Sequence, residues 1–457
     1  MGATLRIEPG AKFTLTRFGH RGEEMRNVGW MKVYGQLIAE GTPEQEIVFT
    51  QGDRFGNWNY IKFIGHNASW SSLKHCRFIG GGRRDSNSYI GESSVVTGAL
   101  WLDNSIPKIE YCTIQDTKLY EQGDWSGSGA FGGYWDCGIR LENLSAGYVL
   151  SNNTISNCTK GIAVYNCLNP PLIATNTLTN NTYCFYQDPN SLPQYQGNIF
   201  KDNEYPVILT GRAPRMYRVG VNEVWSTTGC DITIPEARWK KAELPYAIDD
   251  FLRVTKDSRL IIDPGVVVKV RGTLKIDGTL IAEGNSSSKI VFTSINDDER
   301  HISKSSDWDY IYFIEGSKGT LTHCLVKYAM NGVYIDRANV DNITDCSISH
   351  SYYSGLYLSH VSPTISNCTF SYNGEHGIFC DNYSSPVIQN GTISHNGSKQ
   401  YHFGILCKNY SNAVVSNNVI SHNGGCGFGQ DVNSFPRYDG NKLSGNKYNA
   451  IGITGNR

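Results

Sequence analysis

Two carboxylates and an arginine in the first third of the chain are the residues whose types and spacing could perform chemistry. Asp103 follows Trp101 by two positions, and Glu142 follows Arg140 by two positions. If the two segments are neighbouring strands, Asp103 and Glu142 stack about 4.8 Å apart. Like charges that close favour keeping one carboxyl protonated, the arrangement that glycoside hydrolysis uses for its acid and its base. Arg140 could form a structural ion-pair cluster with both carboxylates. Alternatively Arg83, Arg84 or Arg140 could supply the base of a polysaccharide lyase.

The segments beside this pair carry inserted chain. The interval is 36 residues from Cys76 to Cys112 and 41 residues from Cys112 to Asn153, where the plain repeat described below takes 22. Long loops on a rigid scaffold are where binding and catalytic residues concentrate. Because both insertions leave adjacent coils at the same corner, we expect a wall beside a groove whose floor carries Trp101 and Tyr165. The inserted residues predicted to bind a substrate are Arg83, Arg84, Glu121, Asp124, Trp125, Tyr134, Trp135 and Asp136.

A second candidate surface lies in the last third of the chain. Strand alternation turns Val333 and Ile335 inward, so that Tyr334 and Asp336 face outward. The same position on successive coils gives an outward aromatic column, and a polar column runs beside it. The aromatic column is Tyr334, Tyr357 and Phe379, followed by Leu406, and the polar column is Asp336, Ser359, Asp381 and Lys408. These columns predict either a platform for sugar rings or an aromatic ladder that only stabilises the strands.

The elements that position these residues follow from one short repeat. Cys324, Cys346 and Cys368 are each 22 residues apart, and each begins an alternating run such as Cys346-Ser347-Ile348. After each run a glycine opens a second alternating run, as in Gly355-Leu356-Tyr357-Leu358-Ser359. A repeat this short, without a helical period, predicts an all-β solenoid in which each repeat is one coil of a parallel β-helix.

Longer matches indicate that the chain is an internal duplication. Residues 35–41, Gly-Gln-Leu-Ile-Ala-Glu-Gly, return as Gly-Thr-Leu-Ile-Ala-Glu-Gly at 278–284, and Ile47-Val48-Phe49-Thr50 returns at 290–293. We therefore expect a first β-helical half over 1–210 with inserted loops and a second, more regular half over 256–457. Residues 211–255 break the pattern, and their apolar content favours irregular connecting and capping coils over a free linker.

Composition excludes several classes of partner. The 41 Lys and Arg balance the 42 Asp and Glu, so no overall charge attracts nucleic acid or an anionic membrane. No stretch of 18 apolar residues is present, so membrane insertion is not expected.

The 13 cysteines lack the spacing of zinc ligands, and several recur at one point of the repeat. That recurrence favours an inward column of free, small apolar side chains over disulfides.

Histidines also recur at one point of the repeat, as Ser349-His350, Ser394-His395 and Ser421-His422, with Tyr372 on the intervening coil. We interpret them as a ladder at a repeated turn, because no acidic residues accompany them in register to support a metal site. No metal and no cofactor are predicted.

Nearly the whole chain resembles a known class of proteins. The run Leu260-Ile261-Ile262-Asp263-Pro264-Gly265, the segment 278–284 and Trp308 resemble right-handed parallel β-helix repeat proteins of archaeal and bacterial cell surfaces. The Asn-Cys-Thr-Ile and Gly-Ile-x-Val coils resemble the pectate-lyase-like superfamily. That superfamily includes polysaccharide lyases, glycoside hydrolases, sugar epimerases and non-catalytic surface proteins, so the resemblance implies a scaffold rather than an activity. The first half lacks the tryptophan segment that precedes the pattern, which favours a larger parent protein.

Three functions are consistent with these patterns. The first is an extracellular or cell-surface β-helix that binds a polysaccharide along the groove of the first half. The second is a carbohydrate-active enzyme in the same groove, a glycoside hydrolase or a lyase, with Asp103, Glu142 and Arg140 as its catalytic residues. The third is a structural surface-layer or spacer element. The expected partner is a polysaccharide or cell-surface glycan, and the oligomeric state is left open.

Overall fold

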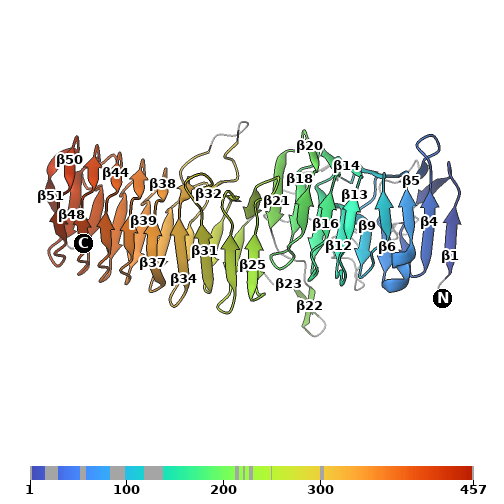
Figure 1. Ribbon diagram of the computed structural model, residues 1–457, viewed down its shortest axis with the longest axis horizontal. Coiled ribbons are helices and arrows are strands. Elements are labelled where there is room, and N and C mark those ends of the chain that lie inside the picture. The colour runs from blue at the N-terminus through green and yellow to red at the C-terminus, as the bar shows by residue number, and fades with distance from the viewer. Residues whose placement is uncertain are drawn as a thin grey trace. The chain divides into compact units, whose positions relative to one another are not determined.

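The computed structural model describes residues 3–15, 29–51, 58–82, 98–117, 137–210, 230–248, 250–298 and 303–454, and the backbone of 216–219 and 222–225. The chain divides into two compact units. Unit 1 comprises Met1–Thr228 and Ala242–Leu244, and unit 2 comprises Gly229–Lys241 and Pro245–Arg457. In both units short parallel strands stack coil upon coil into a β-helix, as the repeat predicts (Figure 1).

Unit 1 places its strands on three faces. The first face is β1 (Thr4–Ile7), β4 (Gln36–Glu40), β7 (Ser72–Lys74) and β10 (Lys108–Glu110), with β13 (Val149–Ser151), β16 (Leu172–Ala174) and β19 (Gln194–Gln196). The second is β2 (Lys12–Leu15), β5 (Ile47–Gln51), β8 (Cys76–Ile79), β11 (Thr113–Gln115), β14 (Thr154–Ser156), β17 (Thr177–Thr179) and β20 (Ile199–Lys201). The third is β3 (Met31–Val33), β6 (Ile61–Ile64), β9 (Gly98–Asp103), β12 (Cys137–Glu142), β15 (Lys160–Tyr165), β18 (Tyr183–Gln187) and β21 (Tyr205–Thr210). A short 3₁₀ helix, η1 (His66–Trp70), and an antiparallel hairpin, β22 (Met216–Val219) and β23 (Asn222–Trp225), lie outside these faces.

Unit 2 repeats the three-faced plan. One face is β24 (Cys230–Ile232), β27 (Phe251–Val254), β30 (Thr273–Ile276), β33 (Ile311–Phe313), β36 (Val333–Asp336), β39 (Leu356–Ser359), β42 (Ile378–Asp381), β45 (Ile405–Cys407), β48 (Cys426–Asp431) and β51 (Tyr448–Thr454). Another is β25 (Glu236–Trp239), β28 (Arg259–Ile262), β31 (Thr279–Glu283), β34 (Lys318–Thr322), β37 (Asn339–Thr344), β40 (Thr364–Ser366), β43 (Val387–Gln389), β46 (Val414–Ser416) and β49 (Arg437–Asp439). The third is β26 (Tyr246–Ile248), β29 (Val267–Val270), β32 (Ile290–Ser294), β35 (Cys324–Lys327), β38 (Ser347–Ser349), β41 (Thr369–Ser371), β44 (Thr392–Ser394), β47 (Val419–Ser421) and β50 (Lys442–Ser444).

The core is a stack of inward-facing apolar side chains. In β36 the burial alternates, with Val333 and Ile335 fully buried and Tyr334 and Asp336 partly exposed, as strand alternation predicts. The corners between strands hold non-glycine residues at positive φ, for example His395 (φ 56). Asn and other short polar residues tolerate that region best, which explains their abundance in the sequence.

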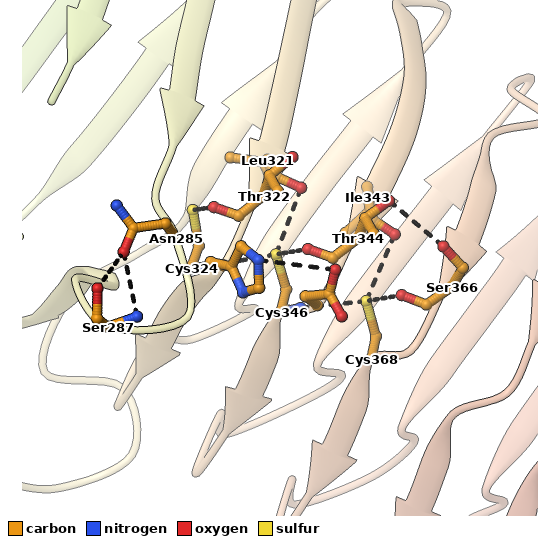
Figure 2. Close-up of polar contacts among 12 residues, drawn as sticks. Asn285, Ser287, Leu321, Thr322, Cys324, Ile343, Thr344, Cys346, Ser366 and Cys368 are labelled. Carbon is orange, nitrogen blue, oxygen red and sulfur yellow. Dashed lines mark hydrogen bonds and ion pairs between the residues drawn. The ribbon is translucent and has the colours of Figure 1, made fainter. Parts of the chain in front are cut away.

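The cysteine column is confirmed. Cys324, Cys346 and Cys368 lie in a row on successive coils (Figure 2). The Cys346 thiol donates to the carbonyl oxygens of Leu321 at 3.4 Å and Thr344 at 3.2 Å, and the Cys368 thiol repeats this pattern one coil later. All 13 cysteines are buried and none forms a disulfide. Thiols that are both buried and hydrogen-bonded act as small core side chains.

Asparagine takes the place of cysteine at the same corner of other coils. In unit 1 the backbone N–H of Cys112 donates to Asn153 Oδ1 at 3.0 Å, and Asn153 N donates to Asn176 Oδ1 at 3.0 Å. The Asn153 amide also donates to the carbonyl two residues before it, which is the bond that the cysteine thiols make. Cysteine and asparagine both supply a small donor at this corner, although Gly391 occupies the equivalent position of another coil without one.

The predicted duplication stays a prediction, but matching hydrogen bonds support it. Trp58 Nε1 donates to Ile79 O at 2.8 Å, and Trp308 Nε1 donates to Lys327 O at 2.8 Å. Within the segment expected to be irregular, β24, β25 and β26 instead pair in register with β27, β28 and β29 of unit 2.

Candidate functional site

The third face of unit 1 brings the predicted residues Trp101 and Arg140 together. Lys62, Trp101 and Arg140 pair in register across β6, β9 and β12. The Arg140 guanidinium lies between two rings, 4.7 Å from the Trp101 centroid and 4.5 Å from the Tyr165 centroid. Lys62 Nζ lies 3.5 Å from the Trp101 centroid. Cation–π stacking of this kind stabilises a buried guanidinium, and Arg140 is only 1% exposed.

The two carboxylates lie where the sequence predicts them, in register on neighbouring strands. Each has its own cation. Glu142 accepts from Arg140 through both oxygens, at 3.0 Å from Nε and 2.9 Å from Nη2, while Asp103 Oδ2 lies 2.9 Å from Lys62 Nζ. Glu142 also accepts from the Trp101 indole at 2.9 Å. This geometry favours the ion-pair alternative for Arg140, because the two cations offset the repulsion that would divide the carboxyls into acid and base.

Tyr165 closes the stack. Its ring is 1% exposed, and burial raises the pKa of its phenol well above the usual value. Among the described residues, its hydroxyl finds no hydrogen-bond partner. An unpaired hydroxyl in a buried site is unfavourable.

The remaining residues of the predicted groove lie outside the described residues. They are Arg83, Arg84, Glu121, Asp124, Trp125, Tyr134, Trp135 and Asp136. The predicted wall and its groove therefore stay predictions.

The predicted aromatic column of unit 2 is present over Tyr334, Tyr357 and Phe379 and extends one coil further back, but the prediction that Leu406 faces outward is wrong, because Leu406 packs with Phe403 and is 4% exposed. Tyr312, Tyr334, Tyr357 and Phe379 pair in register on β33, β36, β39 and β42. Successive ring centroids are 4.9, 4.6 and 4.9 Å apart, and the ring planes meet at 15°, 80° and 76°. All four rings are partly exposed. Tyr357 is perpendicular to both of its neighbours, so its contacts with them are edge-to-face and the rings are not all stacked in parallel.

A polar row runs beside the aromatic column. Asp381 Oδ2 accepts from Tyr357 Oη at 2.6 Å, and Asp381 Oδ1 accepts from Asn409 Nδ2 at 2.6 Å. Burial, followed by the hydrogen bond to Asp381, raises the pKa of Tyr357. Asp336 contacts Arg337 Nη2 at 2.8 Å. The row offers the Arg337 guanidinium and the Asn409 amide to solvent, and Asp336 in part, whereas Ser359 and Asp381 are only 4% and 8% exposed.

A third row, which the sequence interpretation missed, flanks the polar row on its other side. His360, Tyr383 and Tyr410 follow the polar positions by one or two residues and all have positive φ. Tyr383 and Tyr410 stack at 5.2 Å with an interplanar angle of 7°, and they are 64% and 50% exposed. The recurrence of Asn-Tyr-Ser at 382–384 and 409–411 was the available signal. The polar row therefore runs between two rows that contain aromatic rings.

The histidine ladder is confirmed at a turn of unit 2. Rings of His350, Tyr372, His395 and His422 stack at 5.4, 4.9 and 4.9 Å, and all four residues have φ of 56° or 57°. In the part of the chain that the structure describes, no group of three or more His, Cys, Asp or Glu side chains is placed to hold a metal. Within the same part, no helix is both long enough and apolar enough to cross a membrane.

Comparison with known families gives two partial matches. Residues 310–457 match the family described as right handed beta helix region, and residues 124–223 match the family described as periplasmic copper-binding protein (NosD). No curated protein matches the chain. Together with the sheet topology, these matches show a right-handed parallel β-helix and confirm the resemblance to proteins of that fold.

Two solved structures align with nearly the whole chain at low similarity. The A-module of a mannuronan C-5 epimerase from Azotobacter vinelandii is 11% identical, with 99% of this chain and 89% of that chain covered and a TM-score of 0.24. A PL6 family alginate lyase is 9% identical, with 99% and 100% covered and a TM-score of 0.19. At these TM-scores neither structure bears on the activity of this chain.

The copper in the name of the second family finds no matching ligands here. Residues 124–223 contain no histidine and a single methionine, Met216. The cysteines of this segment are buried, and the thiols of Cys158 and Cys167 donate to backbone carbonyl oxygens at 3.2 and 3.3 Å. Burial raises the pKa of Cys167 to about 12, which disfavours the thiolate that a soft metal requires. The described residues of this segment therefore do not fit a copper site.

Proposed function

We propose that this protein is a non-catalytic polysaccharide-binding β-helix that holds glycan chains along the outward faces of its coils. The observation that carries the proposal is the three-row surface of unit 2, in which Asp336, Ser359 and Asp381 run between the Tyr334 column and the Tyr383 row. Sugar rings stack on aromatic side chains while their hydroxyls bond to carboxylates and amides. The coil spacing of about 4.8 Å is close to the length of one hexose ring, so successive coils can engage successive sugars.

The corresponding face of unit 1 is the expected groove, and we propose it as a second, weaker binding surface. Lys62, Asp103 and Glu142 reach solvent there, with 15%, 24% and 20% of their side chains exposed. Trp101 offers little surface for a sugar, because it is 8% exposed and two cations lie against it.

The alternative function is a carbohydrate-active enzyme that uses Asp103 and Glu142. It requires one carboxyl to act as an acid, yet each carboxylate is paired with a cation. Arg140 is a poor candidate for the lyase base, since its guanidinium is buried and bonded to Glu142. These contacts favour binding over catalysis.

The fold and the periplasmic family match support a location outside the cytoplasm, at the cell surface or in the periplasm. Polysaccharides occur in both locations, which is consistent with the proposed partner.

Retention by immobilised glycans tests the proposal. We expect the full chain to be retarded in affinity electrophoresis by at least one polymer of a panel of neutral and acidic polysaccharides. The double variant Tyr334→Ala and Phe379→Ala should weaken that retention by about tenfold or more, because stacking is lost at two positions of the column, one on each side of Tyr357. The matched control is Tyr372→Ala, which removes an exposed ring of the histidine ladder and should leave retention unchanged.

Two outcomes would contradict the proposal. Retention by no polymer of the panel would favour the structural spacer. Release of reducing ends or of unsaturated products, lost on Glu142→Gln, would favour the enzyme.

A further inference from the structure

The outward column that carries the aromatic rings of unit 2 has two different ends. Its in-register positions, in chain order, are Asp231, Arg253, Lys275, Tyr312, Tyr334, Tyr357, Phe379, Leu406, Gly429 and Gly452. Before Tyr312 the column stays accessible, because the side chains of Arg253 and Lys275 are 40% and 29% exposed. After Phe379 it leaves the surface, because Leu406 is 4% exposed. The accessible rings therefore form a strip with one open end and one covered end.

Phe403 covers the column where the strip ends. The two outward positions after Leu406 are glycines, and a Cβ atom at Gly429 or at Gly452 would lie 2.6 Å from the Phe403 ring. The ring thus occupies the layer that outward side chains occupy on earlier coils, and it clusters with Leu406 against Phe379. Phe403 is only 4% exposed, so this layer is itself covered, whereas Phe379 is partly exposed. The surface of the protein therefore rises directly after Phe379.

An inserted turn accompanies this rise. The neighbouring coils need four residues from an asparagine to the glycine before the next strand, as in Asn-Gly-Glu-His-Gly at 373–377 and Asn-Gly-Gly-Cys-Gly at 423–427. The coil between them needs eight, from Asn396 to Gly404. Residues 398–401 of this longer connection are exposed, and Tyr401 is 55% exposed. The turn therefore projects from the coil that follows Phe379.

Buried contacts hold the turn in place. His376 Nδ1 accepts from the backbone N–H of Phe403 at 2.9 Å, and the two rings lie 5.9 Å apart with an interplanar angle of 16°. The backbone N–H of His402 donates to Lys399 O at 3.0 Å, which closes the turn on itself. The His402 ring is buried and lies edge-on to His376 at 5.9 Å. Contacts of this kind oppose local opening, so a ligand at Phe379 meets a barrier that is already formed.

We propose that the turn at residues 398–403 is an end wall of the glycan surface, so that the protein recognises the terminal sugar of a linear chain, seated on Phe379, instead of the middle of a chain. The inference rests on the proposed glycan-binding function and adds to it the part of the polymer that is bound. Four rings from Tyr312 to Phe379, at about 4.8 Å per coil, accommodate a terminal segment of about four sugars. The rest of the chain leaves at the open end, past Lys275.

The saturation stoichiometry on intact and shortened polymers tests the end wall. The probes are four linear polymers: xylan and mixed-linkage β-glucan, which are neutral, and polygalacturonate and polyglucuronate, which are acidic. Each is compared at equal mass before and after partial hydrolysis, and isothermal titration calorimetry with the full chain measures how much protein is bound per gram. Recognition of chain ends predicts that this amount rises with the number of ends, about tenfold for a tenfold shorter chain, because each chain then holds one protein molecule. Binding along the chain predicts no rise.

A variant without the wall gives a second readout. Deleting residues 399–402 restores the four-residue connection, and Phe403→Ser matches Ser354, which precedes the glycine of an earlier coil. In this variant Leu406 and Gly429 continue the strip, so the amount bound per gram of intact polymer should rise several-fold and should no longer depend on chain length. His422→Ala, which removes an exposed ring of the histidine ladder, is the control and should keep the dependence on chain ends. Circular dichroism confirms that both variants are folded.

The outcomes separate the end wall from the function on which it rests. Equal binding per gram of intact and shortened polymer by the unmodified protein would overturn the end wall and leave the glycan surface in place. A folded variant without the wall that still binds in proportion to chain ends would contradict the role of the turn. Failure of all four polymers to bind at any length would overturn the proposed function, and the end wall with it.

Discussion

At the scale of single residues, some outward strand positions of this β-helix hold charged side chains in ion pairs instead of exposing them to solvent. Arg140 projects from a strand face and is nevertheless almost fully buried, because Trp101 and Tyr165 cover it and Glu142 neutralises it. Asp103 and Lys62 form a second pair on the adjoining strands. The two carboxylates that most suggested catalysis in the sequence, Asp103 and Glu142, are thus each held in an ion pair with a cation.

Replacing Arg140 by alanine tests this interpretation. Removing one partner of a largely buried pair leaves Glu142 without its cation and opens a gap between two rings, so we expect a loss of about 2–4 kcal/mol in the free energy of unfolding. Urea denaturation followed by circular dichroism measures it. Arg77→Ala, which breaks the exposed pair with Glu46, is the control and should cost about 1 kcal/mol or less. Equal losses for the two variants would contradict a buried structural role for Arg140.

His376 gives the protein a dependence on pH. Burial, the charge of His402 and the N–H that Phe403 donates to Nδ1 act on it, and the net effect lowers the pKa of His376 to about 3. His402 lies 5.9 Å away, ring to ring, and Lys408 adds a further positive charge. Because the folded pKa lies below the unfolded value near 6.5, the unfolded chain binds the proton first as pH falls. Stability from this group is complete above about pH 6.5 and decreases toward pH 3.

Denaturation at pH 7 and pH 5 measures that loss. We expect His376 to contribute a decrease of about 2 kcal/mol between the two values, and His376→Gln to remove this part of the pH dependence. A variant that keeps the full pH dependence would show that other groups cause it.

At the scale of elements, polar ladders bind one coil to the next. Asn396 is fully buried; its Oδ1 accepts from Asn373 N at 3.2 Å and its Nδ2 donates to Phe370 O at 3.0 Å. Its amide also donates to Asn423 Oδ1 at 3.0 Å. A single side chain therefore bonds to groups on the preceding coil and on the following coil.

Truncation of Asn396 should be costly for that reason. Asn396→Ala leaves a buried N–H and a buried carbonyl unpaired, so we expect a loss of about 2–4 kcal/mol in stability. Amide exchange at Asn373 should accelerate in parallel, as hydrogen-exchange mass spectrometry can measure. Asn285→Ala, in an exposed turn, should cost about 1 kcal/mol or less. A loss no greater than that of the control would show that the ladder adds no stability.

At the scale of the whole molecule, each unit is a stack of interchangeable coils. Successive coils of unit 2 pair in register, with Asn342 opposite Thr364 and Thr364 opposite Val387. Stability of such a stack is close to a sum over coils and their interfaces. The proposed glycan surface follows from the same regularity, since its rows exist only because equal positions stack.

Removal of one complete coil tests this modularity. Deleting residues 342–363, one 22-residue period, joins positions that already pair, so we expect a folded protein whose melting temperature changes by only a few degrees, about 2–4 °C. Deleting residues 342–352 removes half a coil and should abolish cooperative melting of unit 2, because every following side chain leaves its column. Differential scanning calorimetry distinguishes the two. Similar melting of both deletions would contradict a register-dependent stack.

The sequence by itself determined the coil, its inward and outward positions and its columns, because a solenoid places equal repeat positions next to one another. Tyr334 beside Tyr357, Asp103 beside Glu142 and the cysteine row all followed from counting residues. Only the tertiary structure decided how these neighbours are used. Whether Arg140 binds a substrate or a carboxylate depends on rotamers and on Lys62, which lies 78 residues earlier in the sequence and one coil beyond Trp101 in the ladder. The hydrogen bond that the backbone N–H of Gly197 donates to Glu243 depends on a segment outside the repeat, and no period in the sequence could reveal it.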